Sequence, residues 1–184
     1  MHQNVLRLEE TAFLTIDVQE AFRQSIADLS EIASRIALFA RGAQLLNVPV
    51  LVTEQYPKGL GKTVAEIAEV LPDETEFIEK TAFSSCGANV FIEKMKQIGA
   101  KQIVVAGIEA HICVNQTVHD LLERGFQVHL LADCISARAA ENKQIALAKM
   151  GQSGAILSST EMALFELMRD ARHEQFKAIQ KLVK

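Results

Sequence analysis

The sequence is poor in the features that bind a protein to nucleic acid or to a membrane. It has no Trp and one Tyr in 184 residues, so it offers few aromatic platforms on which single-stranded bases could stack. Nineteen Lys and Arg stand against 23 Asp and Glu, and the net charge of -4 gives no attraction for phosphate backbones. No apolar run approaches the roughly 20 residues that span a bilayer. We therefore expect neither a nucleic-acid partner nor a membrane partner.

Cysteine is scarce as well. Cys86, Cys113 and Cys134 are an odd number and lack the Cys-x-x-Cys spacing of zinc sites, which argues against a disulfide framework. Residues 1–10 contain one Arg and no long apolar run, unlike a secretory signal peptide. A chain of this length also buries enough surface to fold without a covalent staple. These features predict a protein of the reducing cytoplasm.

Short apolar runs alternate with amphipathic stretches along the chain. Strands are predicted at 11–16, 48–53, 76–79, 102–106, 126–132 and 155–157, and helices at 30–46, 89–98, 111–124, 160–168 and 174–183. Continuous apolar strands that alternate with helices indicate a mainly parallel sheet with helices on both faces. We therefore predict a single α/β domain over residues 1–184 with a doubly wound sheet.

Chemically active side chains follow three of the predicted strands. In a doubly wound sheet the ligand crevice lies beyond the carboxyl ends of the strands. Asp17 follows the first strand, Lys80 follows the third, and Cys113 lies shortly after the fourth. Asp17 could accept the thiol proton, Lys80 could hold Asp17 and add positive potential, and Cys113 could attack a carbonyl carbon. The helix expected next to Cys113 would favour its anion, and free N–H groups there could bind an oxyanion.

Each of these features also has a structural interpretation. A lone cysteine after a strand is more often a small buried hydrophobe, the aspartate could be only a helix N-cap, and an isolated lysine is usually solvated. Residues 61–63 (Gly-Lys-Thr) hint at a phosphate-binding loop, but Tyr56 stands where that loop requires Gly, so nucleotide hydrolysis is not expected. His111 and His119 have no third ligand of suitable spacing, which favours structural roles over a metal site.

Four stretches of the sequence resemble the isochorismatase-like cysteine hydrolase superfamily. They are FLTIDVQEAF (13–22), TEQYPKGLGKT (53–63), EKTAFSS (79–85) and GIEAHICVNQTVHDLLERGFQVHLLADC (107–134). The ending of the chain is similar to the isochorismatase domain-containing subgroup. The resemblance implies a doubly wound, Rossmann-like hydrolase fold with an Asp–Lys–Cys triad. In that triad Asp17 is the general base, Lys80 is the lysine and Cys113 is the nucleophile.

The resemblance also implies the surroundings of the nucleophile. It places a cis peptide bond between Ile108 and Glu109, and an oxyanion hole at the backbone N–H groups of Glu109 and Cys113. Phe22 and Ile112 match positions that line the family's pocket. To these we add Tyr56 as a pocket residue, because it lies on the loop after the second strand.

Two departures from the superfamily's patterns narrow the expected activity. Nicotinamidases of the superfamily hold a metal with histidines after the second strand, and residues 53–63 here contain no His. True isochorismatases lack the nucleophilic cysteine that this chain has as Cys113. We therefore expect no metal and no cofactor.

The predicted function is metal-independent hydrolysis of a small amide, carbamoyl or ester substrate through a thioester on Cys113. One alternative is a binding or scaffold protein that keeps the hydrolase fold without turnover. Another is a thiol redox enzyme, which would need Cys86 or Cys134 close to Cys113. The resemblance also suggests a homo-oligomer, either a dimer or a larger assembly.

Overall fold

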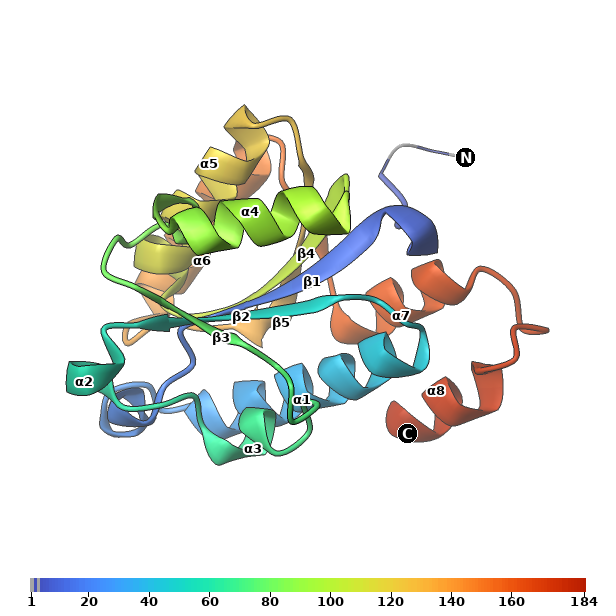
Figure 1. The fold of residues 1–184 in the computed structure, drawn as a ribbon, viewed down its shortest axis with the longest axis horizontal. Coiled ribbons are helices and arrows are strands. Elements are labelled where there is room, and N and C mark those ends of the chain that lie inside the picture. Colours follow the sequence, from blue (N-terminus) through green and yellow to red (C-terminus); the bar gives the residue numbers. More distant parts are fainter. Residues whose placement is uncertain (1, 3) are drawn as a thin grey trace.

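The computed structural model describes residues 2 and 4–184, and at its centre lies a six-stranded parallel sheet (Figure 1). The strands are β1 (Thr11–Ile16), β2 (Val50–Gln55), β3 (Phe77–Lys80), β4 (Gln102–Gly107), β5 (Gln127–Ile135) and β6 (Ile156–Ser158). Their order across the sheet is β3-β2-β1-β4-β5-β6, so the winding reverses between β1 and β4. The predicted doubly wound α/β fold is confirmed.

Helices cover both faces of the sheet (Figure 1). One face carries α1 (Leu29–Leu45), α3 (Ala65–Ala68), α7 (Thr160–Met168) and α8 (Phe176–Leu182). The other face carries α4 (Asn89–Ile98), α5 (Asn115–Glu123) and α6 (Ala140–Gln152). A short helix α2 (Pro57–Leu60) follows β2, 3-10 turns lie at Leu8–Glu10, Glu20–Gln24 and Ser85–Gly87, and a π-helical turn spans Ala110–Val114. None of the described helices combines the length and apolar character needed to cross a bilayer.

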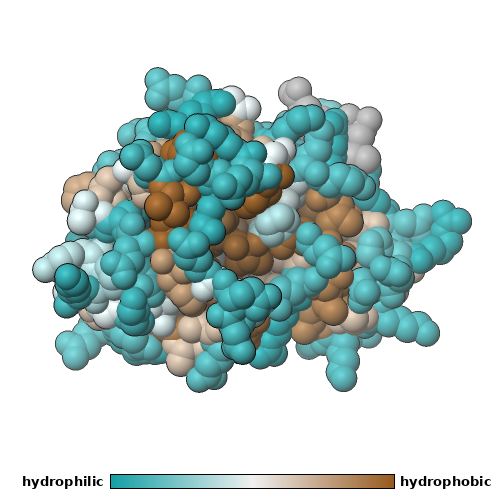
Figure 2. Space-filling view, viewed as in Figure 1, coloured by the Kyte–Doolittle hydropathy of each residue, from teal (hydrophilic) through white to brown (hydrophobic). Residues whose placement is uncertain are grey.

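The two central strands are buried along their whole length. Every residue of β1 and β4 is buried, because helices pack against both faces of the sheet. Hydrophilic side chains cover most of the face seen in Figure 2, and apolar ones gather in the hollow between α4 and the front edge of the sheet. The core therefore lies in two layers, one on each side of the sheet.

The ends of β1 and β4 approach each other closely at the carboxyl edge of the sheet. Gly107, the last residue of β4, lies opposite Ile16, the last residue of β1. A Cβ on Gly107 would lie 2.2 Å from the backbone oxygen of Ile16, and the glycine has a φ of +125°. Only glycine meets both requirements. The chain segments after the two strands therefore begin side by side.

Some elements differ from the sequence-based expectation. The helix expected over 111–124 is divided into the π-helical turn and α5, and β5 extends three residues beyond its expected end at 132. Helix α6 was not expected at all. It begins after Ala139 without a side-chain cap, and its buried face includes the small Ala146 while the large Ile145 is exposed. Because apolar residues of this helix do not fall on one face at regular helical spacing, the sequence pattern does not reveal it.

Candidate active site

The carboxyl edge of the sheet brings together Asp17, Lys80 and Cys113. Asp17 directly follows β1, Lys80 ends β3, and Cys113 lies in the π-helical turn after β4. The turn and Asp17 flank the point between β1 and β4 where the winding reverses, which is the usual ligand site in such sheets. The three residues that the sequence singled out therefore share one site.

Asp17 is held by two donors from neighbouring strands. The Lys80 Nζ donates to Asp17 Oδ2 at 2.6 Å, and the Thr53 hydroxyl donates to Oδ1 at 2.7 Å. Both side chains of the Asp17–Lys80 pair are almost fully buried. Asp17 also has a φ of 54°, a left-handed conformation that turns the chain sharply after β1. The carboxylate is therefore fixed in orientation beneath the nucleophile candidate.

The Lys80 ammonium has several further acceptors. Its Nζ donates to Gln55 Oε1 at 2.8 Å, to the backbone oxygen of Phe83 at 2.9 Å and to that of Ala82 at 3.2 Å. Gln55 lies opposite Lys80 in the register of β2 and β3. A buried cation is tolerated where its hydrogen bonds are satisfied in this way. Lys80 therefore also ties the loop after β3 to the site.

Cys113 is buried and its thiol interacts with both members of the pair. Burial raises the pKa of the Cys113 thiol to about 12, and the negative charge of Asp17 adds to the rise while Lys80 opposes it. We had expected the following helix to favour the thiolate. Burial and Asp17 outweigh that effect, so the resting group is a neutral thiol with its proton acceptor beside it.

The backbone after β4 presents a free donor. The Ile108–Glu109 peptide bond is cis. The N–H of Ile108 donates to Ile16 O at 2.9 Å, and the N–H of Ala110 donates to Ser136 O at 2.8 Å. Between them, the N–H of Glu109 has no acceptor within residues 2 and 4–184. It is thus available to an oxygen atom of a ligand.

A cavity of about 110 Å³ opens over the thiol. Its walls are formed by Asp17, Phe22, Gln55, Leu60, Phe83, Ile108, Glu109, Ile112 and Cys113. Phe22 and Ile112 are wall residues that the sequence predicts, whereas Leu60 at the end of α2 and Phe83 in the loop after β3 are not. Gln55 could have been found from the strand pattern, since it ends β2 beside Lys80.

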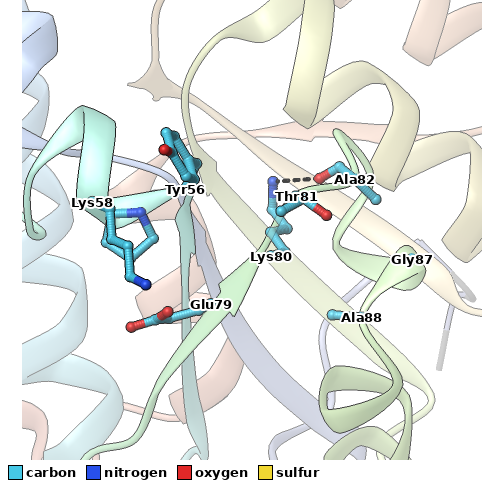
Figure 3. Close-up of a pocket in the computed structure, with 9 residues that line it drawn as sticks. Tyr56, Lys58, Glu79, Lys80, Thr81, Ala82, Gly87 and Ala88 are labelled. Carbon is cyan, nitrogen blue, oxygen red and sulfur yellow. Dashed lines mark hydrogen bonds between the residues drawn. The ribbon is translucent and has the colours of Figure 1, made fainter.

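Tyr56 does not line this cavity, contrary to our expectation. It lines a neighbouring hollow of about 390 Å³, where Figure 3 shows it with Lys58 and Glu79 opposite Thr81 and Ala82. β2 ends at Gln55, and Tyr56 has a left-handed backbone conformation with a φ of 37°, so the chain turns away from the strand direction at this residue. Tyr56 is 55% exposed. Its ring lies against Gly59, where a Cβ would come within 2.6 Å of the ring atoms.

Glu109, one of the wall residues of the cavity, forms an ion pair with Arg138. The Glu109 carboxylate accepts from both the backbone N–H and the Nε of Arg138, each at 3.0 Å. Glu109 is buried, while the Arg138 side chain is 56% exposed. The negative charge of Glu109 is therefore already partnered before any substrate enters.

The remaining cysteines and histidines contribute little to this site. Cys134 packs in the core layer on the opposite face of the sheet from Cys113, 3.1 Å from the Thr160 hydroxyl. Cys86 shares the core layer of Cys113, and burial raises the pKa of its thiol to about 11. His119 lies 2.6 Å from the backbone oxygen of Asn115. Within the described part of the chain, no three His, Cys, Asp or Glu side chains are grouped as metal ligands.

Comparisons with known proteins identify the family of the chain. Residues 11–162 match the isochorismatase domain. The chain is 41% identical over 180 residues to isochorismatase domain-containing protein 2 of Danio rerio, covering 97% of the chain and 89% of that relative. It superimposes with a TM-score of 0.93 on the structure of MAR1 ribonuclease from Caenorhabditis elegans, at 37% identity, covering 97% of this chain and 92% of that one.

A more distant relative was solved with a covalent ligand. YcaC from Pseudomonas aeruginosa, determined with hexane-2,5-diol and covalent acrylamide, has a TM-score of 0.90 and 26% identity over 99% of this chain and 93% of its own. The domain match spans most of the sequence and agrees with the resemblance carried by the four motifs. The chain therefore belongs to the isochorismatase domain family.

Proposed function

We propose that the chain is a metal-independent cysteine hydrolase that acts on a small amide, carbamoyl or ester substrate. The observation that supports this most directly is that Cys113 and Asp17 line one cavity, with Asp17 held in a buried ion pair with Lys80. A thiol, a carboxylate and an ammonium in contact are the groups that acyl transfer through a thioester requires.

In the acylation step the Cys113 proton moves to a carboxylate oxygen of Asp17 while Sγ attacks the substrate carbonyl carbon. The carbonyl oxygen becomes an oxyanion and accepts a hydrogen bond from the Glu109 N–H, with the Cys113 N–H as the second donor. Lys80 stabilises the thiolate as it forms, because proton transfer has neutralised Asp17. The bond to the leaving nitrogen or oxygen then breaks, and Asp17 returns the proton to the leaving group.

Deacylation uses the same groups. A water molecule gives a proton to Asp17 and attacks the thioester carbon, which again forms an oxyanion at Glu109. The carbon–sulfur bond breaks, and the proton on Asp17 returns to the Cys113 sulfur. The net reaction consumes one water and yields an acid and an amine, ammonia or alcohol.

The test is acyl transfer to Cys113 from 4-nitrophenyl butanoate, followed by intact-protein mass spectrometry and by release of nitrophenol. We expect a mass increase of one butanoyl group at Cys113 and continuing turnover. Cys113→Ala should remove both signals, and Asp17→Asn should slow turnover by about 100-fold or more. Cys86→Ala is the matched control, since it removes a buried thiol from the same core layer.

The alternative of a binding protein without turnover has one observation in its favour. The raised pKa of Cys113 keeps the thiol neutral at rest. A correctly folded protein that shows neither acylation nor turnover in this test would support that alternative. The C. elegans relative is named a ribonuclease. For this chain we propose no nucleic-acid partner, because its net charge is -4 and the Lys80 ammonium already has its acceptors.

We further propose that residues 1–184 form one hydrolase domain that works in the cytoplasm as a homo-oligomer, either a dimer or larger. Exposed apolar side chains at Leu157, Met162 and Phe165 support association of subunits. Light scattering after size-exclusion chromatography tests this part. A mass of about 20 kDa at micromolar concentration would contradict it.

A further inference from the structure

We infer that the cavity over Cys113 selects a compact, uncharged aliphatic acyl group of about four or five non-hydrogen atoms, such as propanoyl, butanoyl or 2-methylpropanoyl. It excludes aromatic acyl groups by size and carboxylate-bearing ones by charge. This inference rests on the proposed hydrolase function and specifies its substrate class.

The size limit follows from the cavity volume of about 110 Å³. An apolar protein cavity of about 150 Å³ holds one benzene molecule, which has six carbon atoms. A cavity smaller than that accommodates about four or five non-hydrogen atoms in contact with its walls. A benzoyl group has eight, so it does not fit without displacing a wall residue.

The chemical preference follows from the walls. Phe22, Leu60, Phe83, Ile108 and Ile112 contribute apolar side chains. They come from the 3-10 turn after β1, from α2, from the loop after β3 and from the segment after β4, so the apolar surface surrounds the bound group. Each methylene that such walls remove from water strengthens binding about fourfold until the space is full.

The exclusion of charge follows from the pairing of the polar side chains in the same walls. Asp17 is bonded to Lys80, and Glu109 is bonded to Arg138. The Gln55 side chain accepts from Lys80 and donates to a backbone carbonyl. A charged acyl group would lose its hydration and find no free counter-charge. The Glu109 N–H and the Cys113 N–H are reserved for the carbonyl oxygen of the substrate in the proposed reaction.

The experiment measures kcat/KM and the acylation rate of Cys113 for the 4-nitrophenyl esters of acetate, butanoate, hexanoate and benzoate. We expect butanoate to exceed acetate by about fourfold or more, and to exceed hexanoate and benzoate by at least tenfold. The charge limit is measured by competition against butanoate hydrolysis. The probes are 2-methylpropanamide and oxamate, whose acyl groups have equal numbers of non-hydrogen atoms. We expect the uncharged amide to compete at a concentration at least tenfold lower.

Leu60→Ala tests whether the wall itself sets the limit. It should raise the hexanoate-to-butanoate ratio of kcat/KM at least fivefold, because it removes wall atoms and enlarges the cavity. Leu45→Ala is the matched control, since Leu45 is exposed at the end of α1 and the ratio should not change. If Leu60→Ala does not fold, as judged by circular dichroism, Leu60→Val replaces it with a smaller expected increase.

Failure of the selectivity inference and failure of the proposed hydrolase function give different results in these experiments. Equal acylation of Cys113 by all four esters, or better competition by oxamate, overturns the selectivity inference and leaves the hydrolase function standing. Absence of acylation by every ester overturns the proposed function and the inference with it. An unchanged ratio in the folded Leu60 variant shows that this wall does not select the substrate.

Discussion

The Lys80 ammonium lies 2.6 Å from the Asp17 carboxylate, and the two side chains are 0% and 2% exposed. Each buried charge is therefore stabilised by the opposite charge of its partner. The same contact places a proton acceptor and a cation beside the Cys113 thiol. Stability and proposed catalysis thus rest on one ion pair, and the two roles can be separated by experiment.

Removing the cation alone should be strongly destabilising. Lys80→Met leaves Asp17 as a buried, uncompensated carboxylate, and we expect the free energy of unfolding to fall by about 3–5 kcal/mol. Urea denaturation followed by circular dichroism measures this. Adding Asp17→Asn to Lys80→Met should recover part of the loss, because no unpaired charge then remains. Lys58→Met, on the exposed helix α2, should change stability by less than about 0.5 kcal/mol. Equal losses in the single and double variants would contradict this account.

The resting thiol should be unreactive at neutral pH. Burial raises the pKa of Cys113 to about 12, so the thiolate fraction rises about tenfold for each pH unit over the range below that value. We expect the rate of iodoacetamide labelling at Cys113, located by mass spectrometry, to rise with this slope between pH 7 and pH 9. A rate that is already maximal at pH 8 would show that the thiol is ionised at rest.

Asp17→Asn should separate two roles of the carboxylate. The Asp17 charge contributes to the raised pKa of Cys113, so the neutral amide should lower that pKa and speed labelling. The same variant loses the proton acceptor and should lose ester turnover. Faster labelling with slower turnover would support Asp17 as the general base. Slower labelling together with slower turnover would instead indicate a distorted site.

The predicted topology placed the triad candidates at one edge of the sheet, and the family resemblance assigned their roles. The carboxyl ends of parallel strands share one edge, so residues after β1, β3 and β4 had to meet there. The cavity walls were harder to anticipate. Leu60 and Phe83 lie in the connections after β2 and β3, whose packing has no period. Tyr56 follows β2 in a left-handed backbone conformation, which the sequence pattern does not reveal, and lines the neighbouring hollow. The raised pKa of Cys113 depends on burial, which a sequence position does not reveal.

Acid should weaken the fold through His129 in β5. This residue is fully buried, and neither ring nitrogen has a hydrogen-bond partner among the described residues. Burial lowers the pKa of His129 to about 4, whereas the unfolded chain has the ordinary value near 6.5. The unfolded state therefore binds more protons between these values, and stability that is present above pH 6.5 is lost as the pH falls toward 4.

Protonation of His129 should lower the free energy of unfolding by about 3 kcal/mol between pH 6.5 and pH 4. Urea denaturation at pH 7 and pH 4.5 measures it, with His129→Leu as the variant and His173→Gln as a control in the C-terminal loop. The Leu variant should show a smaller difference between the two pH values than the parent protein. An equal difference would assign the acid sensitivity to other groups.

Gly107 and Gly151 should respond in opposite directions to the same change. In Gly107→Ala the new Cβ would lie 2.2 Å from Ile16 O at a φ of +125°, so β1 and β4 must separate at the edge that carries the site. We expect a loss of about 3 kcal/mol or more in the free energy of unfolding, together with loss of ester turnover. In Gly151→Ala the Cβ would meet no heavy atom within 4 Å among the described residues, apart from its chain neighbours and the backbone of its own helix α6. The free energy of unfolding of that variant should rise by about 0.5–1 kcal/mol and its activity should be kept, because alanine loses less backbone entropy than glycine in a helix.

Thermal and urea denaturation of the Gly107 and Gly151 variants tests both expectations. A Gly107→Ala protein with parental stability and turnover would mean that the close approach of the two strands does not hold the site together.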